Sequence, residues 1–98
     1  IGLREPIAAR PGRKVTKETI EAKIVDTQYY QWPGTTLTLC SIALANGYST
    51  LGESACVVKE NFDARIGEKL AYADAFRKIW ALEGYLLAEE IAMAPKTP

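Results

Sequence analysis

The chain has 98 residues, with 12 basic and 12 acidic side chains, two cysteines and no histidine. A chain of this length forms one domain with a modest core. The neutral balance argues against a general binder of polymeric nucleic acid or membrane surfaces, because such binders rely on excess positive charge. Without histidine or a CxxC motif, most zinc sites and all histidine-based catalysis are excluded. No apolar run reaches the roughly 18 residues of a membrane span, so we expect a cytosolic protein.

Residues 1–14 are expected to form a flexible basic arm. This segment contains two prolines and two glycines and shows no periodicity. Its charged residues are Arg4, Glu5, Arg10, Arg13 and Lys14. The alternative is a basic finger that closes over an anion. A single α+β domain then covers residues 15–93, and residues 94–98 form a tail.

The first element of the domain is predicted to be a helix from Lys17 to about Thr27. Thr16 is a suitable N-cap, and apolar residues follow it at helical spacing. The next segment, residues 28–35, places three aromatic side chains beside a Pro-Gly turn. Such a cluster is typical of a lid over the core, and the alternative is a stacking platform for a base or a sugar.

The pair Asn46-Gly47 predicts a β-hairpin between strands at residues 36–45 and 48–57. The first segment is rich in β-branched and aliphatic residues, whereas residues 52–56 of the second are richer in small residues than a stable strand needs. If these two residues alone form the turn, Ile42 faces Leu51 across the ladder. The predicted sheet is therefore antiparallel and built on this hairpin.

The same register places Cys40 and Cys56 on opposite faces of the ladder. We therefore expect two separate, reduced cysteines, as a cytosolic setting also predicts. A bulge near Cys40-Ser41, where the apolar phase shifts, would overturn this placement. Gly52 marks either a bulge or the close approach of another backbone or ligand.

Residues 61–93 are predicted to form one long helix, capped by Asn61 or Asp63. Its expected buried stripe consists of Phe62, Ile66, Leu70, Ala73, Phe76, Trp80, Leu87 and Ile91. A second apolar set consists of Tyr72, Ala75, Ile79, Leu82 and Leu86. One small sheet cannot cover both sets, so we expect a second copy of the chain to cover one. Gly67 is expected to permit a close backbone approach, and Gly84 marks either a kink or an uninterrupted helix.

Catalytic groups are hard to find in this sequence. Ser54 has no histidine to act as its base, and the acidic residues show no evident pairing, so we expect a binding protein rather than an enzyme. Chemistry by carboxylates alone is the alternative. No glycine-rich phosphate loop is present.

Binding is easier to motivate, because four basic residues follow the long helix: Arg65, Lys69, Arg77 and Lys78. Beside aromatic rings, such side chains can hold a phosphorylated small molecule that carries a base. The alternative is that they are solvent-exposed charges that pair with Glu68 and Asp74 across one helical turn.

Several motifs in fixed order resemble a family of small phage early proteins. They are a PGTT turn, the NG hairpin, a GESAC segment, NFD with a following IG, and a KIW-LEGYLL ending. The resemblance spans about residues 16 to 90. This family is also similar to the phage anti-Thoeris sponges, the Thoeris anti-defence protein one family, which bind a cyclic ADP-ribose isomer made by bacterial TIR-domain defence proteins. Some of these sponges also take up cyclic oligonucleotides.

The second resemblance implies a homo-oligomer, a dimer or a hexamer, in the host cytoplasm, with a signal pocket shared between subunits and no cofactor. The residues that it places at the pocket are Leu51, Asn61, Ile66, Ala75 and Lys78, with Arg77 as an alternative cation. Two of them depart from the family pattern. Leu51 is not aromatic, so a base cannot stack on it, and Lys78 lacks the bidentate fork that an arginine offers a pyrophosphate. The competing hypothesis is a phage protein that binds a host protein through its long helix, without a small molecule.

Overall fold

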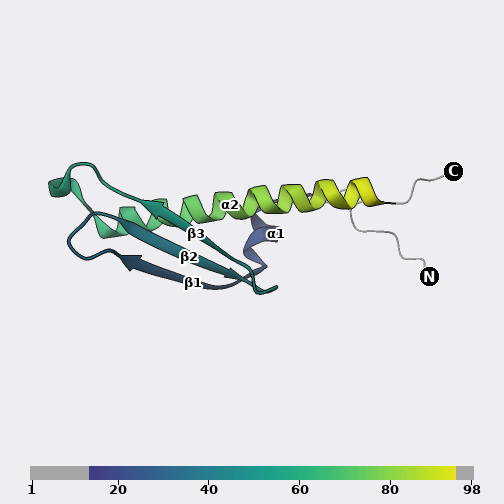
Figure 1. Cartoon of the computed structure of the whole chain (residues 1–98), viewed down its shortest axis with the longest axis horizontal. Helices are drawn as coiled ribbons and strands as arrows, with labels where there is room; N and C mark the ends of the chain where they lie inside the picture. Colours follow the sequence, from purple (N-terminus) through teal and green to yellow (C-terminus); the bar gives the residue numbers. More distant parts are fainter. Residues whose placement is uncertain (1–13, 95–98) are drawn as a thin grey trace.

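The computed structural model describes residues 14–94, which form an α+β fold in which one long helix lies along a three-stranded antiparallel sheet (Figure 1). The strands follow one another in the order β1-β2-β3. The elements are α1 (Lys17–Glu21), β1 (Ile24–Gln31), β2 (Thr38–Leu44), β3 (Ser49–Ser54), the short 3-10 turn η2 (Lys59–Asn61) and α2 (Ala64–Met93). The predicted fold class is confirmed. The basic arm except Lys14, and the tail except Ala94, lie outside the described residues.

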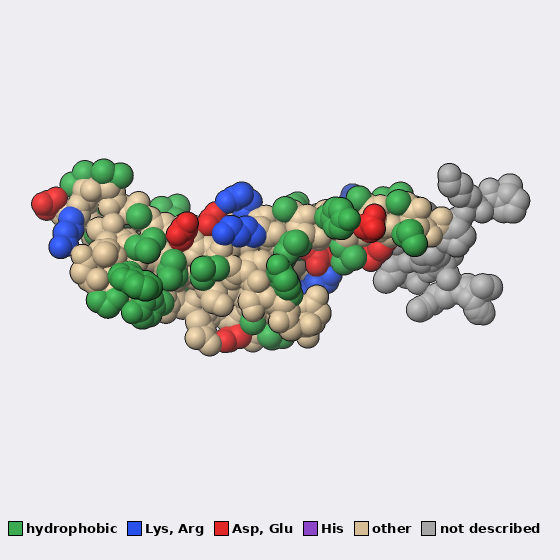
Figure 2. Space-filling model, viewed as in Figure 1, with side chains coloured by type: hydrophobic (Ala, Val, Ile, Leu, Met, Phe, Trp, Pro, Cys, Tyr) green, Lys and Arg blue, Asp and Glu red, His purple; other side chains and the backbone are tan. Residues whose placement is uncertain are grey.

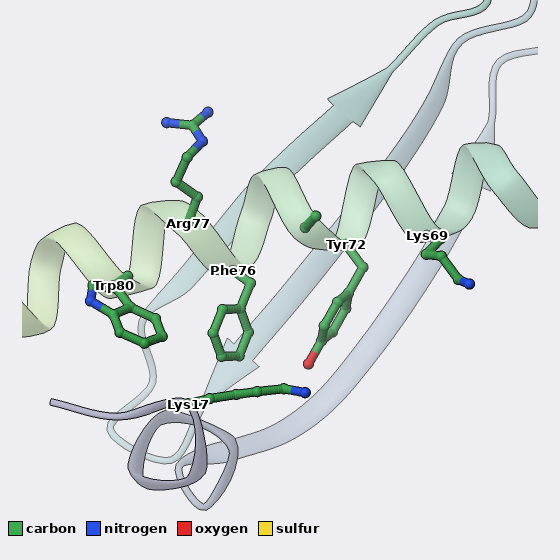
Figure 3. A pocket seen from close by; sticks show the side chains of 7 residues that line it. Lys17, Lys69, Tyr72, Phe76, Arg77 and Trp80 are labelled. Atoms are coloured by element: carbon green, nitrogen blue, oxygen red, sulfur yellow. The ribbon is translucent and has the colours of Figure 1, made fainter.

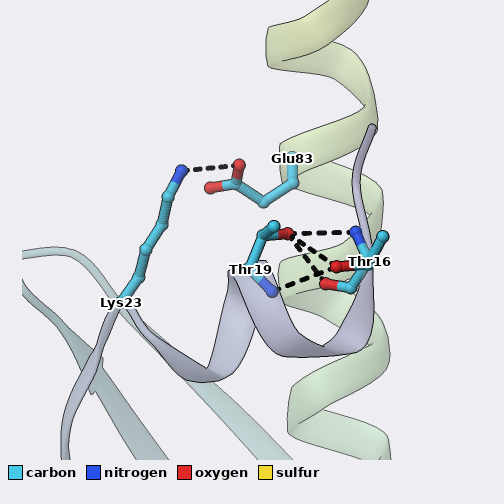
Figure 4. Close-up of polar contacts among 4 residues, drawn as sticks. All are labelled: Thr16, Thr19, Lys23 and Glu83. Carbon is cyan, nitrogen blue, oxygen red and sulfur yellow. Dashed lines mark hydrogen bonds and ion pairs between the residues drawn. The ribbon is translucent and has the colours of Figure 1, made fainter. Parts of the chain in front are cut away.

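The helix α1 is shorter than predicted. Its start is confirmed, because Thr16 and Thr19 form a reciprocal cap in which each backbone N–H donates to the other's hydroxyl, at 3.0 and 3.1 Å (Figure 4). The extension to Thr27 is wrong, since Ile24 already begins β1. The β-branched residues that follow the cap favour the pleated sheet, where they pair with β2.

The hairpin between β2 and β3 forms, but its register differs by one residue from the prediction. Ile42 pairs with Thr50 rather than with Leu51. The loop has three residues, because the Leu44 N–H donates to the Tyr48 carbonyl at 2.8 Å. A two-residue type I′ turn needs positive φ at both positions, whereas only Gly47 has it here, at +93°.

This register changes the surroundings of the cysteines. Cys40 faces Gly52 across the ladder and is fully buried, whereas Cys56 lies beyond the end of β3 and is half-buried. Their predicted placement on opposite faces of one ladder is therefore wrong. Both are free thiols, as predicted. The irregularity in the sheet lies between Ile24 and Asp26, rather than near Cys40.

A narrow stripe of small residues joins α2 to the sheet. The helix residues that are buried are Gly67, Ala71, Ala75 and Ile79. At Gly52 an added Cβ would lie 2.1 Å from the Ala71 carbonyl oxygen, so the backbones of β3 and α2 are in direct contact. Hydroxyl groups of β3 reinforce this contact, since Thr50 donates to the Ala75 carbonyl at 3.1 Å and Ser54 to the Gly67 carbonyl at 2.7 Å.

The predicted buried stripe of α2 is wrong as a whole. Ile66, Leu70 and Trp80 are exposed, while Phe76 and Leu87 are half-buried. Close approach of the helix to β3 leaves room only for small residues at Gly67, Ala71 and Ala75, so most of the larger side chains, apart from Ile79, lie on the other sides of the helix. The core consists of Ile20, Cys40, Ile42, Leu44, Ala71, Ala75 and Ile79.

Two further expectations are settled by the fold. The aromatic cluster does not cover the core, because Tyr30 and Trp32 are exposed and contact each other edge to face, with centroids 5.9 Å apart.

The helix α2 continues through Gly84 without a break and extends past the end of the sheet (Figure 1). The radius of gyration is consequently 17.9 Å, against about 13 Å for a compact chain of this size.

Candidate functional site

Three of the predicted site residues meet in one groove. Leu51 on β3 and Arg77 and Lys78 on α2 line an open groove of about 500 Å³ between the edge strand and the helix. The other residues around it are Tyr48, Ser49, Thr50, Ala81 and Leu82. We call this hollow the β3–α2 groove. It combines an apolar floor with two cations, which is the arrangement expected for an anionic organic ligand.

Asp74 organises the cations of the β3–α2 groove. One of its carboxylate oxygens pairs with the Arg77 guanidinium, and the other lies 3.8 Å from the Lys78 ammonium. The Glu53 backbone N–H also donates to Asp74, at 3.0 Å. That N–H, followed by the Arg77 side chain, lowers the pKa of Asp74 below its usual value. Two cations thus face one fixed anion, which leaves an excess positive charge at the groove.

Lys78 is also tied to the strand. Its ammonium donates a hydrogen bond to the Leu51 carbonyl at 2.6 Å, so the predicted apolar wall and the predicted cation are in direct contact. The Lys78 side chain is 48% exposed and that of Arg77 71% exposed. Both side chains can therefore contact a ligand from solvent without any rearrangement of the core.

Tyr48 is a groove residue that the sequence analysis missed. It follows the hairpin turn, and its exposed ring lines the same hollow as Leu51. The ring supplies the aromatic surface that Leu51 lacks. The signal that could have found it is its place directly after the Asn46-Gly47 turn, three positions before Leu51.

The other predicted site residues lie elsewhere. Asn61 and Ile66 line a separate hollow of about 170 Å³ near the start of α2. Ile66 and Lys78 are twelve positions apart, a distance of about 18 Å along the helix axis, so one chain does not bring the two groups together. Ala75 is fully buried beneath Gly52 and offers no surface to a ligand.

The cap of α2 is Asp63, one of the two predicted candidates. Its carboxylate accepts a hydrogen bond from the Arg65 backbone N–H at 2.9 Å, and this bond is the main reason that its pKa is lowered. Asn61 instead ends the η2 turn, where its N–H donates to the Val58 carbonyl at 2.9 Å. The Asn61 side chain is therefore not needed as a cap.

A second groove, of about 470 Å³, follows an aromatic ladder on α2 (Figure 3). Tyr72, Phe76 and Trp80 point toward α1, with successive ring centroids 5.8 and 6.1 Å apart. The Lys17 side chain of α1 runs past the outer ends of the Phe76 and Tyr72 rings, whereas Arg77 points away from the rings (Figure 3). We call this hollow the aromatic groove. Arg77 lines both grooves.

Within residues 14–94 no three histidine, cysteine or acidic side chains gather as metal ligands would. Over the same residues no helix combines the length and the apolar character that crossing a bilayer requires.

Comparison with known proteins identifies the family of this chain. Residues 15–91 match the phage protein (N4 Gp49/phage Sf6 gene 66) family. Neither the curated proteins nor the solved structures contain a match. The matched region begins just before α1 and reaches nearly to the end of α2, so it includes the sheet and both grooves. The chain therefore belongs to the N4 Gp49/phage Sf6 gene 66 family of phage proteins.

Proposed function

We propose that this phage protein is an anti-defence sponge that binds a cyclic ADP-ribose-type signalling nucleotide and keeps it from its effector without cleaving it. The observation that carries the proposal is the meeting of Leu51, Arg77 and Lys78 in the β3–α2 groove, together with Tyr48. Resemblance to the anti-Thoeris sponges had pointed to Leu51, Arg77 and Lys78, though not to Tyr48, and family membership supports a phage origin. Cyclic oligonucleotides are further ligands of the same class.

The groove has chemistry that suits such a ligand. The pyrophosphate carries two negative charges, and Arg77 and Lys78 supply two cations, one of them a planar fork that can bind two phosphate oxygens. Asp74 already pairs with both, so the ligand must compete with one carboxylate for them. The Tyr48 ring provides a surface on which a base can stack. In the assembly that the resemblance implies, Asn61 and Ile66 would come from a neighbouring subunit.

Sequestration requires tight, stoichiometric binding. A dissociation constant in the nanomolar range corresponds to about 12 kcal/mol. Calorimetric titration with cyclic ADP-ribose isomers should therefore give a saturating signal at one fixed stoichiometry. The ligand should be recovered with unchanged mass after the protein is denatured, whereas an altered product would identify a carboxylate enzyme instead.

Variants of the groove test the assignment. Arg77→Ala and Lys78→Ala should each weaken binding at least about tenfold, because each removes a charge-assisted hydrogen bond. Lys17→Ala is the matched control, since Lys17 is a surface lysine outside the β3–α2 groove and should leave binding unchanged. Absence of heat with every cyclic ADP-ribose isomer and with cyclic di- and trinucleotides refutes the proposal.

The alternative function is binding of a host protein through α2. The observation that favours it is the exposed apolar surface of this helix, which includes Ile66, Leu70 and Trp80. A stable host complex, lost on Leu70→Glu, in a protein that binds none of these nucleotides would establish this alternative.

A further inference from the structure

The two cations of the β3–α2 groove share one carboxylate, which lies beside the groove rather than in its lining. Arg77 and Lys78 line the groove, and none of the described residues around it is acidic. Asp74 pairs with Arg77 through one carboxylate oxygen, and its other oxygen lies near the Lys78 ammonium. Figure 2 shows basic side chains near the middle of the molecule, where α2 lies along the sheet, with acidic side chains directly beside them. A ligand in the groove therefore meets two positive charges and one negative charge.

Asp74 is held more firmly than the cations with which it pairs. Its carboxylate accepts the Glu53 backbone N–H, which ties it to β3, and its side chain is only 22% exposed. The side chains of Arg77 and Lys78 are far more open to solvent, so they can turn toward a ligand. A ligand that draws both cations to itself consequently leaves the carboxylate in place.

The fixed carboxylate limits how much negative charge a ligand can bring to the groove. A ligand with two negative charges neutralises Arg77 and Lys78, and Asp74 then leaves an excess of one negative charge. This excess repels a third or fourth charge on the ligand, whereas without Asp74 the same complex would be neutral. Because the Asp74 side chain is mostly buried, solvent screens this repulsion less than it screens repulsion between surface charges.

We propose that Asp74 sets the charge of the nucleotides that the β3–α2 groove accepts, favouring a doubly charged pyrophosphate diester over nucleotides that end in a free phosphate. This inference rests on the proposed function, since it requires a nucleotide in this groove. A cyclic ADP-ribose isomer has no terminal phosphate. ADP and ATP carry about three and about four charges, because a terminal phosphate loses its second proton with a pKa near 6. Asp74 thus keeps the abundant linear nucleotides of a host cell from filling the groove.

Three linear nucleotides test this role, because they share adenosine diphosphate and differ in the charge at its end. ADP-ribose carries about two charges, ADP about three and ATP about four. Their dissociation constants are measured by calorimetry without magnesium, for the native full chain and for Asp74→Asn, which keeps an oxygen that can accept the Glu53 N–H.

The measured quantity is the ratio of the ADP constant to the ADP-ribose constant. This ratio should fall at least about fivefold from the native chain to Asp74→Asn, and the corresponding ratio for ATP should fall further. Contacts of the terminal ribose are the same in both proteins, so they cancel in this comparison.

Ionic strength gives an independent readout of the same repulsion. The native ratio should shrink as the salt concentration rises from about 0.05 to about 0.5 M, because added ions screen the charge of Asp74. The ratio for Asp74→Asn should change much less. A role of Asp74 limited to bonding β3 would not produce this difference in salt dependence.

Two further variants separate the charge of Asp74 from its structural contacts. Asp74→Glu keeps the charge and should retain the native ratios. Asp63→Asn is the matched control, because it makes the same change at a carboxylate of the α2 cap, which lines a different hollow, and asparagine is also a good N-cap. It should leave the ratios unchanged. Circular dichroism of all three variants should show the native helix content.

Three outcomes overturn the inference. Equal ratios in the native chain and in Asp74→Asn would show that the carboxylate does not act on ligand charge. If Asp74→Glu behaves like Asp74→Asn, Asp74 acts through its bond to β3 instead. If neither protein binds any of the three nucleotides, the groove is not a site for adenosine diphosphate ligands. A chain that binds a cyclic ADP-ribose isomer while its ratios are insensitive to Asp74→Asn retains the sponge function and loses only the charge selection, so the two failures are distinguishable.

Discussion

Asp74 shows how one side chain links the fold to the candidate site. It accepts the Glu53 N–H from the edge strand and pairs with Arg77 on its own helix. Asp74 thereby links β3 to α2 and also holds Arg77 and Lys78 in place beside the β3–α2 groove. Because these contacts favour the carboxylate, the pKa of Asp74 is lowered in the folded chain.

The lowered pKa predicts a loss of stability in acid. A carboxyl group whose pKa is lower in the folded state than in the unfolded state stabilises the fold above its unfolded value, about 4. This stabilisation disappears as the pH falls through the folded pKa. Urea unfolding between pH 5 and pH 2 should therefore show a shallower decline for Asp74→Asn than for the native chain. Asp63, the helix cap, also has a lowered pKa. Part of the decline in the free energy of unfolding between pH 5 and pH 2 should therefore remain in Asp74→Asn and should disappear only when Asp63→Asn is added. If Asp74→Asn leaves the pH dependence of the free energy of unfolding unchanged, the Asp74 carboxylate does not make these contacts in the folded chain.

The two cysteines should differ sharply in reactivity. Burial raises the pKa of the Cys40 thiol, and thiolate is the reactive form. Cys56 is half-buried beyond the end of β3. A maleimide at neutral pH should therefore label one thiol per native chain, and Cys56→Ser should abolish that fast labelling. Rapid labelling of Cys40 in the Cys56→Ser chain would contradict the placement of β2 against α2.

At the scale of elements, the contact between β3 and α2 depends on Gly52. A methyl group there would meet the backbone of Ala71 and Ala75, which cannot move without separating the helix from the sheet. Gly52→Ala should therefore lower the free energy of unfolding by about 3 kcal/mol or more. Gly84→Ala is the control, because nothing lies within 4 Å of that position and alanine favours the helix by about 1 kcal/mol. Urea unfolding of the dilute proteins gives both values, and equal effects would mean that Gly52 is not a contact point.

The elements differ in how far they could be predicted. The 3.6-residue period was enough to predict α2. It could not show which face of the helix contacts the sheet, because a stripe of small residues and a stripe of large apolar residues both recur with this period. Ala71 was overlooked because small residues carry little hydrophobic signal, and Gly67 was expected only to permit a close backbone approach. The start of α1 could be predicted from its cap, but its end could not, because β1 is fixed by pairing with β2 across the chain. Likewise, the Asn46-Gly47 pair predicts a hairpin, while the register depends on the φ angle of Asn46.

The candidate site was predictable in part for the same reason. Resemblance selected Leu51 and Lys78, which lie in contact. It could not show that Asn61 and Ile66 lie in another hollow, because that depends on the straight path of α2 from Ile66 to Lys78. The aromatic groove was hidden by the expectation that Phe76 and Trp80 belong to the core.

The shape of the whole molecule leads to a last prediction, about the part of α2 that extends past the sheet. Residues 84–93 have no sheet beneath them (Figure 1), and a helix segment of about ten residues is marginal by itself in water. If a second copy of the chain covers this part of the helix, as expected from its two apolar sets, hydrogen exchange of these amides should be slow in concentrated protein and should accelerate on dilution to concentrations at which the copies dissociate. Amides of residues 71–79, which the sheet covers, provide the internal control and should be insensitive to dilution. Equal protection of the extending segment at all concentrations would mean that contacts within one chain hold it. Fast exchange at all concentrations would mean that no second copy covers this segment.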